Sequence, residues 1–480
     1  MNIEPQTSKP SYEQLEKLLE QTTQQLRVAL DRIAILEEEV RGLKTQLKLN
    51  SSNSSRPPAS DPPWTPKSER IKTGTKPGGQ KGHPGSSLKM VALPDQTIVH
   101  PVKDICECGL NLKVANLLNL EKRQVFDLPV IKILVVEHQV EVKQCQCGRI
   151  HRGVFPDGVS QATQYGSHVK GISTYLMLHQ LIPFERTKQF FQDVLQLEIS
   201  QGSLQNFQIE AFKKLEVVES KIKAQLMVSN VNHFDETGYA KNLKLCWMHV
   251  VSNKKLTYYQ THPKRGREAM NALGILPHFT GVAVHDCFES YFSYGVQHSL
   301  CNAHLLRELR RVEEQNKQTW AGSMRGLLCE IKVLVDSSQT GVLNVVEQHN
   351  FEVLFDGLLV EAQALNLKQE RKLETGKRGR VGQSFAFNLV ARMVKYRNEI
   401  LRFMREKDVP FDNNLAERDL RMFKVQQKVS GCFRGDGDVW AARIRGYLSS
   451  IRKQGLNALE AMVSVFRGQP LLPPSLCNAG

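Results

Sequence analysis

Two short strand-like runs that each lead into an acidic residue constrain the fold of this chain most strongly. Residues 228–234 run into Asp235 in the segment His-Phe-Asp-Glu-Thr-Gly, and residues 282–284 run to Asp286 in Val-Ala-Val-His-Asp-Cys. Val228, Val231 and Phe234 recur through the first run, and the second is the apolar Val-Ala-Val, so both indicate short strands. We therefore expect an α/β domain in which both carboxylates lie near strand ends.

The segments around these runs give an order of elements. Residues 245–252 and 256–261 are typical of a hairpin joined by Asn-Lys-Lys, residues 264–274 of a short helix, and residues 299–300 of a further strand. The resulting order of three strands, helix, strand, helix and strand is that of a ribonuclease-H-like α/β domain. Carboxylates on neighbouring central strands of such a sheet can lie side by side.

Glu417 is a third acidic residue, near the start of a helix that the sequence predicts over residues 415–428. Helical spacing puts Glu417 on one face with Arg421, Lys424 and Lys428. One carboxylate followed by three cations suits a metal ligand beside a DNA backbone. The alternative is a pair between Glu417 and Arg421 within the helix, which stabilises by only about 0.2–0.5 kcal/mol.

Three converging carboxylates can bind the two magnesium ions that an in-line attack on phosphate requires. About 50 and 130 residues separate the three acids along the chain, yet two strand ends and one helix start can meet in a folded domain. A single acid is more often a helix cap or a surface charge. The hypothesis of a catalytic metal site therefore depends on Asp235, Asp286 and Glu417 together.

Residues 12–47 carry a heptad pattern of apolar residues. One seam position reads Tyr12, Leu19, Leu26, Ile33, Val40 and Leu47, and the other reads Leu15, Thr22, Ala29, Leu36 and Leu43. Such a repeat predicts a coiled coil, because a single helix cannot bury this seam alone. We expect it to join copies of the chain, and the alternative is a helix packed on its own protein.

Residues 51–98 predict a linker, because Pro, Gly and Ser are too dense for helix or sheet. The segment holds seven Lys or Arg against three acidic residues, and the whole chain has a net charge of +15. Both suit a polyanionic partner. Lys76 and Lys81, beside glycines, are candidate phosphate contacts. The alternative is a plain flexible tether.

Four cysteines fall in two similar pairs that predict a structural zinc site. Cys106 and Cys108 form one pair, and Cys145 and Cys147 the other, each followed by glycine and separated by a strand-rich stretch. Two thiolate pairs can hold a tetrahedral zinc ion, with His100 and His151 as possible substitutes. The Cys-x-Cys spacing makes the usual turn harder to form, and unmetallated buried thiols are the alternative.

Residues 165–225 are typical of helices, with an apolar face at 175–182, a second helix over 187–197 and a third capped by Ser200. A helix, a short turn and a capped helix resemble a helix-turn-helix that binds DNA. An ordinary helical bundle that supports the next domain is the alternative.

A chain of 480 residues exceeds the roughly 250–300 residues at which single cores stop growing, so we expect several domains. No apolar run reaches the roughly 18 residues of a membrane span, and no secretory signal is evident. The ten cysteines are then expected as thiols or metal ligands in a reducing cytosol. The expected segments are a coiled coil (1–50), a basic linker (51–98), a cysteine-rich β domain (99–155), a helical DNA-binding domain (156–225), a ribonuclease-H-like catalytic domain in two parts (226–300 and 411–454), an all-α insertion (301–410) and a C-terminal tail (455–480).

Several motifs in a fixed order resemble one family. They are the N-terminal heptads, Asn-Ser-Ser-Asn-Ser-Ser-Arg-Pro-Pro, Lys-Pro-Gly-Gly-Gln-Lys-Gly-His, the cysteine pairs, Asp-Glu-Thr-Gly, Cys-Asn-Ala-His-Leu-Leu-Arg-Glu-Leu, Asn-Asn-Leu-Ala-Glu-Arg-Asp-Leu-Arg and Lys-Val-Ser-Gly-Cys-Phe-Arg. Single tripeptides would be weak signals, but their order over more than 400 residues is specific. Along nearly its whole length the chain resembles transposases of the insertion sequence 66 family, which are DDE-type enzymes.

The resemblance implies that Asp235, Asp286 and Glu417 form the catalytic triad, with a helical insertion before the glutamate. It also implies Mg²⁺ or Mn²⁺ as cofactor, terminal inverted repeats and target DNA as substrates, and a cytoplasmic, nucleoid-associated bacterial protein. Companion proteins of the same element are possible partners. Arg434, which ends the last motif, is a further expected DNA contact.

Two other functions stay open at this point. One is an inactive or domesticated transposase that only binds DNA, although all three acids are intact. The other is a ribonuclease-H-like nuclease acting on branched DNA, which the long insertion and the heptads disfavour. Cys301 and His304 could bind a metal, and we favour a structural or DNA-positioning role for them.

Overall fold

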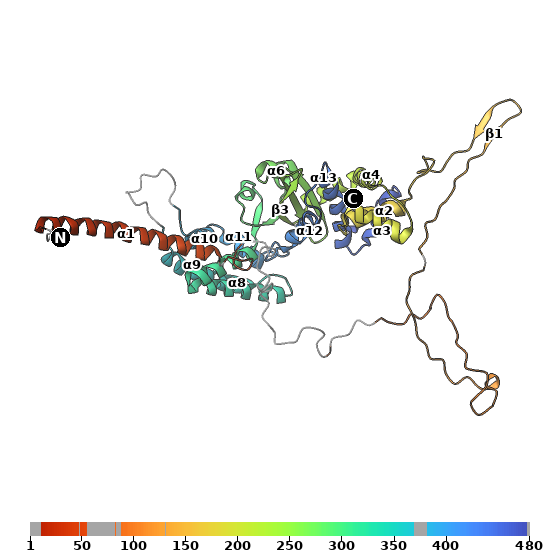
Figure 1. The fold of residues 1–480 in the computed structure, drawn as a ribbon, viewed down its shortest axis with the longest axis horizontal. Helices are drawn as coiled ribbons and strands as arrows, with labels where there is room; N and C mark the ends of the chain where they lie inside the picture. The colour runs from red at the N-terminus through yellow and green to blue at the C-terminus, as the bar shows by residue number, and fades with distance from the viewer. Residues whose placement is uncertain are drawn as a thin grey trace, which may run out of the picture. The chain divides into compact units, whose positions relative to one another are not determined.

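The computed structural model describes most of the chain (Figure 1). The described residues are 11–47, 49–54, 82, 88–129, 131–368 and 382–477. The chain divides into two compact units, one of residues 1–67, 163–187 and 201–480 and one of residues 68–162 and 188–200. Lys76 and Lys81 lie outside the described residues, together with most of the predicted linker.

The larger unit contains a five-stranded mixed sheet in the order β5-β4-β3-β6-β7. The strands are β3 (Val231–Lys241), β4 (Lys244–Ser252), β5 (Thr257–His262), β6 (Val282–His285) and β7 (Gln297–Leu300). β3 and β5 each pair antiparallel with β4, whereas β6 runs parallel to β3 and β7 parallel to β6. The helix α6 (Arg267–Leu273) and the 3-10 helix η4 (Glu289–Ser293) complete the order of elements predicted for residues 226–300.

Both faces of the sheet are covered, which explains the apolar runs in the sequence. All four residues of β6 are buried. Along β3, Phe234 contacts the rings of Phe279 and Tyr291. Tyr239, an odd number of positions further along, points to the other face of the sheet and contacts the ring of Phe433. The helices that pack against β3, β4 and β5 are α12 (Asn414–Ser430) and α13 (Gly437–Lys453) (Figure 1).

Between β7 and α12 the chain forms a helical insertion with its own apolar core. Trp320, Phe355 and Phe403 are almost completely buried in one cluster of side chains. The helices are α7 (Asn302–Arg311), α8 (Thr319–Ser337), α9 (Val345–Leu365), α10 (Phe385–Lys395) and α11 (Arg397–Leu401), with a π-helical turn η5 (Val312–Asn316) after α7 and a 3-10 turn η7 (Arg402–Met404) after α11.

A second group of helices brings the end of the chain against the segment before the sheet. Its members are α2 (Ser167–Leu178), α4 (Gln201–Lys214), α5 (Glu216–Met227), α13, α14 (Ala458–Phe466) and α15 (Pro474–Cys477). Gly171 of α2 lets α14 approach closely, because a Cβ there would lie 2.7 Å from Val463 Cγ2. Residues 455–480, expected as a tail, therefore contain a packed helix, whose apolar residues recur at helical spacing behind the capping Asn457.

The longest helix, α1 (Tyr12–Leu47), covers the predicted heptads. Its seam residues are exposed, with Leu26 at 58% and Ile33 at 51% of their full accessible surface. Just beyond it, the amide of Asn53 is buried and donates a hydrogen bond to Glu314 Oε2 at 3.1 Å. None of the helices in the described stretches is long and apolar enough to cross a bilayer.

The smaller unit contains one short hairpin, of β1 (Val142–Gln144) and β2 (Ile150–Arg152), and the 3-10 turn η2 (Leu112–Val114). Helix α3 (Phe184–Leu195) begins in the larger unit and ends in this one. The apolar stretch 124–138, expected to form strands between the cysteine pairs, contains no strand among its described residues. Its side chains are mostly exposed and it pairs with no other strand there, so β-propensity alone does not produce a sheet.

Candidate functional site

Asp235 lies within β3, at the place where the parallel pairing to β6 ends. The register of the two strands pairs His233 with Val284, and the same offset places Asp235 level with Asp286. β3 itself continues to Lys241, because β4 pairs with it antiparallel along that length. The expected strand end at Asp235 is therefore wrong, although Asp235 does lie just past the end of the parallel ladder.

Asp286 is the residue directly after β6, in the short loop that leads to η4. Its Oδ1 accepts a hydrogen bond from the backbone N–H of Phe288 at 3.0 Å, which fixes the carboxylate in a tight turn. Burial, followed by the charge of Glu236, raises the pKa of Asp286 to about 6. The positive charge of Arg265 lowers this pKa, since its Nη2 lies 3.7 Å from Oδ2 of Asp286.

Glu417 lies in the first turn of α12, where a carboxylate also interacts favourably with the helix dipole. Its Oε1 is buried without a hydrogen-bond partner, 3.8 Å from His304 Nδ1 and 3.9 Å from Arg307 Nη2. Burial raises the pKa of Glu417, and the charges of Asp412 and Asp286 raise it further. The positive charges of Arg307 and Arg421 lower it, but the net shift is upward.

The three predicted acids act on one another through their charges. Burial raises the pKa of Asp235 well above its ordinary value of 3.8, and Glu236, Asp286 and Glu417 add to that increase. A buried carboxylate beside other carboxylates has a strongly unfavourable ionised state until a cation compensates it. The raised pKa values and the unpartnered Oε1 of Glu417 thus fit a site for divalent cations, which take oxygen ligands.

Asn413, which sequence reasoning missed, holds the start of α12 on β3. Its side-chain N–H donates to the carbonyl oxygen of Phe234 at 2.8 Å, and its Oδ1 lies 2.9 Å from His233 Nδ1. Its backbone N–H donates to Cys301 Sγ at 3.1 Å. Asn413 thereby fixes the distance between the strand of Asp235 and the helix of Glu417. Its place four residues before Glu417, in Asn-Asn-Leu-Ala-Glu, indicates the start of a helix but not the contact with β3.

Cys301, His304 and Glu417 form a compact group of potential metal ligands, whose donor atoms lie within 4.8 Å of one another in the described part of the chain. Burial lowers the pKa of His304 to about 4 and raises that of Cys301 to about 12. Both groups are therefore neutral at pH 7. A neutral imidazole can bind a metal directly, whereas the thiol must first lose its proton.

Glu236, next to Asp235, points to the other side of the strand, as the alternation of β3 predicts. It is buried, with its side chain 1% exposed. Arg265 Nε donates to its Oε1 at 2.7 Å, and the hydroxyl of Tyr291 donates to Oε2 at 2.5 Å. The sequence offers only a weak signal for Arg265, which lies in a basic loop between β5 and α6.

The expected DNA contacts of α12 lie on its exposed side. Arg421, Lys424 and Lys428 are exposed, and so is Arg434 after the helix. Lys424 Nζ also donates to the carbonyl oxygen of Gly238 in β3. Arg421, Lys424 and Lys428 follow Glu417 along one helix, so a phosphate chain lying on α12 would run toward Glu417.

The two cysteine pairs adopt the same turn. The backbone N–H groups of Gly109 and Gly148 donate to the carbonyl oxygens of Cys106 and Cys145, each at 2.8 Å, and both glycines have positive φ. The backbone N–H of the second cysteine in each pair is the largest cause of a lowered pKa in the first, Cys106 or Cys145. Among the described residues, the four sulfurs are not gathered into one ligand group.

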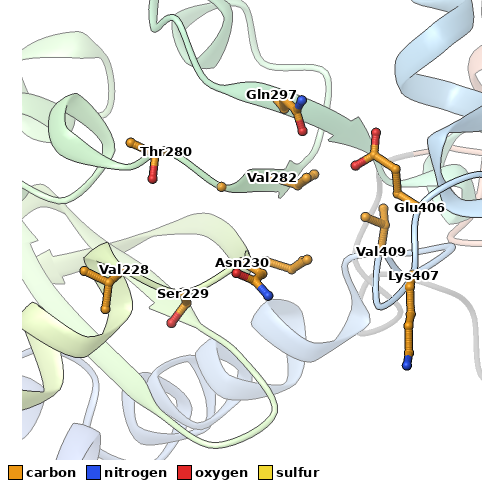
Figure 2. A pocket seen from close by; sticks show the side chains of 11 residues that line it. Val228, Ser229, Asn230, Thr280, Val282, Gln297, Glu406, Lys407 and Val409 are labelled. Carbon is orange, nitrogen blue, oxygen red and sulfur yellow. The ribbon is translucent and has the colours of Figure 1, made fainter. Parts of the chain in front are cut away.

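A pocket of about 280 Å³ opens at the other end of the sheet (Figure 2). Val231, Val282 and Gln297, which begin β3, β6 and β7, line it together with Glu406 and Lys407. Asp235 lies four residues beyond Val231 in β3, Asp286 directly follows β6, and Glu417 lies on α12. This pocket is therefore separate from the candidate catalytic site.

Two family models match the sequence. The one described as "Transposase IS66 family" matches residues 164–440, which is more than half of the chain and includes all three acids. A family of unknown function, DUF6444, matches residues 2–89.

Individual relatives match over shorter stretches. "Uncharacterized protein y4jO" of Sinorhizobium fredii (strain NBRC 101917 / NGR234) is 32% identical over 79 residues, 16% of this chain and 25% of that protein. The chain thus spans a quarter of that relative. A solved structure, titled as a cryoEM structure of a simian T-cell lymphotropic virus intasome in complex with PP2A regulatory subunit B56 gamma, matches 38% of this chain and 57% of its own, at 13% identity and a TM-score of 0.14.

Proposed function

The chain belongs to the IS66 family of transposases, and from that membership we propose that it cleaves DNA at the inverted ends of an insertion sequence and joins them to target DNA. The observation that carries this proposal is the placement of the three acids: Asp235 lies level with Asp286 across β3 and β6, and Glu417 lies on α12, which packs against β3. Their pKa values are all raised. A sheet of this strand order, with acids on β3, directly after β6 and on α12 beyond the insertion, supports a ribonuclease-H-like catalytic domain.

Asp235, Asp286 and Glu417 would hold two Mg²⁺ or Mn²⁺ ions through their carboxylate oxygens. Bound metal ions of this kind activate a water and stabilise a departing 3′ oxygen. The protein supplies the carboxylates and the buried environment. Asn413 and Cys301 supply the contacts that keep β3 and α12 at a fixed separation. Neutral His304 faces Glu417 without adding positive charge.

Two successive substitutions at phosphorus describe the reaction. Water first attacks the phosphodiester at the element end, which breaks one P–O bond, forms another and frees a 3′-hydroxyl. That hydroxyl then attacks a phosphodiester of the target, so that one bond is again exchanged for another. Neither step needs a covalent enzyme intermediate, and the chain therefore needs no Ser or Tyr nucleophile.

The remaining segments have proposed roles in binding DNA. Arg421, Lys424, Lys428 and Arg434 would contact phosphates beside the acids, and Lys76 and Lys81 would do so in the linker. Helices α2 to α4 would recognise the terminal repeat. Two DNA ends must be held together, so α1 would pair with α1 of a second copy as a coiled coil.

The cysteine pairs would hold one structural zinc ion. Their matching turns and the lowered pKa values of Cys106 and Cys145 support this role, because the thiolate is the ligand. Changing Cys106 and Cys108 to Ser should reduce the zinc content of purified protein from about one ion per chain toward none. Cys477→Ser, at an exposed cysteine near the other end of the chain, should leave the zinc content unchanged.

Asp235→Asn tests the catalytic proposal. The labelled substrate is a duplex with the inverted repeat that flanks the gene, incubated with Mg²⁺. The wild-type protein should nick the 3′ end and join it to a plasmid, and the variant should bind the duplex without cleaving it. Asp336→Asn, an exposed position on α8, serves as the control with wild-type cleavage. Cleavage by Asp235→Asn would remove Asp235 from the site, and binding without cleavage by the wild type would favour a DNA-binding protein instead.

A further inference from the structure

Glu236 is a fourth carboxylate near the three acids, on the other side of β3 from Asp235, and its burial as a charged group requires a partner. Glu236 raises the pKa of both Asp235 and Asp286 through its charge, so it makes the ionised site less stable. Its side chain is 1% exposed. A buried charge of this kind is retained only where a partner compensates it. That partner is Arg265.

Arg265 is held on three sides. Nε donates to Glu236 at 2.7 Å, while the guanidinium plane lies over the ring of Phe288 at 4.1 Å and near the ring of Trp247 at 5.2 Å. Tyr291 occupies the second oxygen of Glu236 and so orients the carboxylate that holds the arginine. An arginine fixed in this way loses little further freedom when it binds a ligand.

The guanidinium is placed at the surface of the site. The arginine side chain remains 39% exposed although its partner Glu236 is almost fully buried. Its Nη2 edge faces Asp286 Oδ2 at 3.7 Å, longer than a hydrogen bond. An arginine that served only to neutralise Glu236 would not need to be exposed or to reach Asp286. A second arginine near the acids, Arg307, has no comparable support, since its Nε donates to its own helix at Ala303.

We propose that Arg265 is a phosphate-binding residue of the catalytic site, which uses its Nη edge to bind a phosphodiester of the DNA strand next to Asp286. Glu236, Tyr291, Phe288 and Trp247 are the positioning residues that hold it. Planar guanidinium groups bind phosphate oxygens in pairs, and fixed cations near a reacting phosphate stabilise its transition state. The role rests on the proposed DNA-cleaving function and adds the contact that places the substrate.

Salt dependence of DNA binding tests this role without relying on cleavage. The full-length protein and its Arg265→Gln variant are titrated with a short fluorescent duplex of random sequence over a range of KCl concentrations. Loss of one phosphate contact should reduce the slope of log affinity against log salt by about 0.9. Lys264→Gln is the matched control, because Lys264 is the neighbouring, 65% exposed cation that pairs with Glu268 outside the site. An equal change of slope in both variants would show a general effect of charge and overturn the proposal.

Single-turnover cleavage of the inverted-repeat duplex gives the second measurement. Arg265→Gln should slow cleavage by about 100-fold, and Arg265→Lys should recover at most about a tenth of the wild-type rate, because an ammonium group lacks the planar fork. Glu236→Gln keeps Arg265 but replaces its carboxylate partner with a neutral amide, so its cleavage rate should be intermediate. Wild-type cleavage by Arg265→Gln would overturn the proposal.

A thermal-shift experiment separates phosphate binding from a merely structural role. Arg265→Gln should keep the wild-type increase in melting temperature on addition of Mg²⁺, because the three metal-binding acids are untouched. Loss of that increase would mean that Arg265 positions Asp286 instead of binding DNA. If the wild-type protein itself fails to cleave, the proposed function fails, while the KCl series still decides whether Arg265 binds phosphate.

Discussion

The raised pKa of Asp235 has a cost for stability. The buried carboxylate that would bind a metal ion destabilises the fold when no metal is bound. A carboxyl group whose pKa is raised on folding holds its proton more tightly in the folded protein. The free energy of unfolding therefore falls as the pH rises from the unfolded pKa through the folded one. Burial and three neighbouring acids raise the pKa of Asp235 in this direction.

Asp235→Asn should therefore raise the melting temperature at neutral pH in the presence of a chelator. Relief of about 1 kcal/mol corresponds to about 2–4 °C in a domain of this size. The gain should shrink as the pH falls and disappear below about pH 3, where the unfolded carboxyl group, whose pKa is about 3.9, is also protonated. The hydrogen bond from the N–H of Glu236 to Oδ1 is retained by Asn. A lower melting temperature at neutral pH would contradict the electrostatic explanation.

The raised pKa of Asp286 predicts that metal binding depends on pH. Its pKa is about 6, and only the ionised carboxylate binds a metal ion, so protons compete with the metal below that value. The apparent affinity for Mn²⁺ should fall by up to about tenfold per pH unit as the pH drops below 6. Titrations followed by thermal shift at several pH values measure this. In Asp286→Asn, the affinity should be weak and its pH dependence shallower; an unchanged pH profile would exclude Asp286 as the titrating ligand.

The local placement of the three acids was predictable from the sequence, whereas the contacts that hold their elements together were not. An acid in or after a strand-like run is a local pattern, and so is an acid in the first turn of a helix. Asn413 contacts Phe234 from 179 residues away, and Arg265 contacts Glu236 from 29 residues away. No local periodicity reports such contacts, because they depend on which strands and helices pack together.

At the scale of elements, α13 is tied to β3 by one buried acid. Asp438 is 1% exposed, accepts a hydrogen bond from the hydroxyl of Tyr239 at 2.5 Å and pairs with Lys241 Nζ at 2.8 Å. Removing one member of a buried pair leaves the other charge without compensation.

Asp438→Ala should lower the free energy of unfolding by about 3 kcal/mol or more. Asp436→Ala is a matched control on the same lysine, because Asp436 is 73% exposed and lies 3.7 Å from Lys241 Nζ. Its effect should stay below about 1 kcal/mol. Urea unfolding of both variants measures the difference, and equal effects would show that Asp438 does not tie α13 to the strand.

Strand length and strand existence were the least predictable features of the elements. The sequence placed a strand over residues 228–234, whereas β3 begins at Val231 and its extension to Lys241 depends on pairing with β4. The run at 124–138 has the composition of strands without forming any among its described residues. The tail segment forms α14, because α2 offers a glycine against which Val463 packs. In each case the partner element decided the outcome.

At the scale of the whole molecule, exposed Leu26 and Ile33 on α1 predict association of two or more chains. Changing both to Lys should leave a particle with the 54.4 kDa mass of one chain, because charges at seam positions cannot be buried between helices. Gln24→Lys with Asp31→Lys places the same substitutions on the opposite side of the helix, and this control should stay oligomeric. Light scattering measures the mass, and an oligomeric seam variant would refute the coiled coil.

The position of the helical insertion also has a consequence during synthesis of the protein. Glu417 follows Asp286 by about 130 residues, most of them in the insertion. At about 5–20 residues per second, a ribosome needs roughly 6 to 26 seconds to add them. Through that interval the nascent chain carries two of the three acids and lacks the third. Under the proposed function, an unfinished chain is thus harmless to DNA, and a fragment truncated at residue 410 should show no cleavage in the same assay.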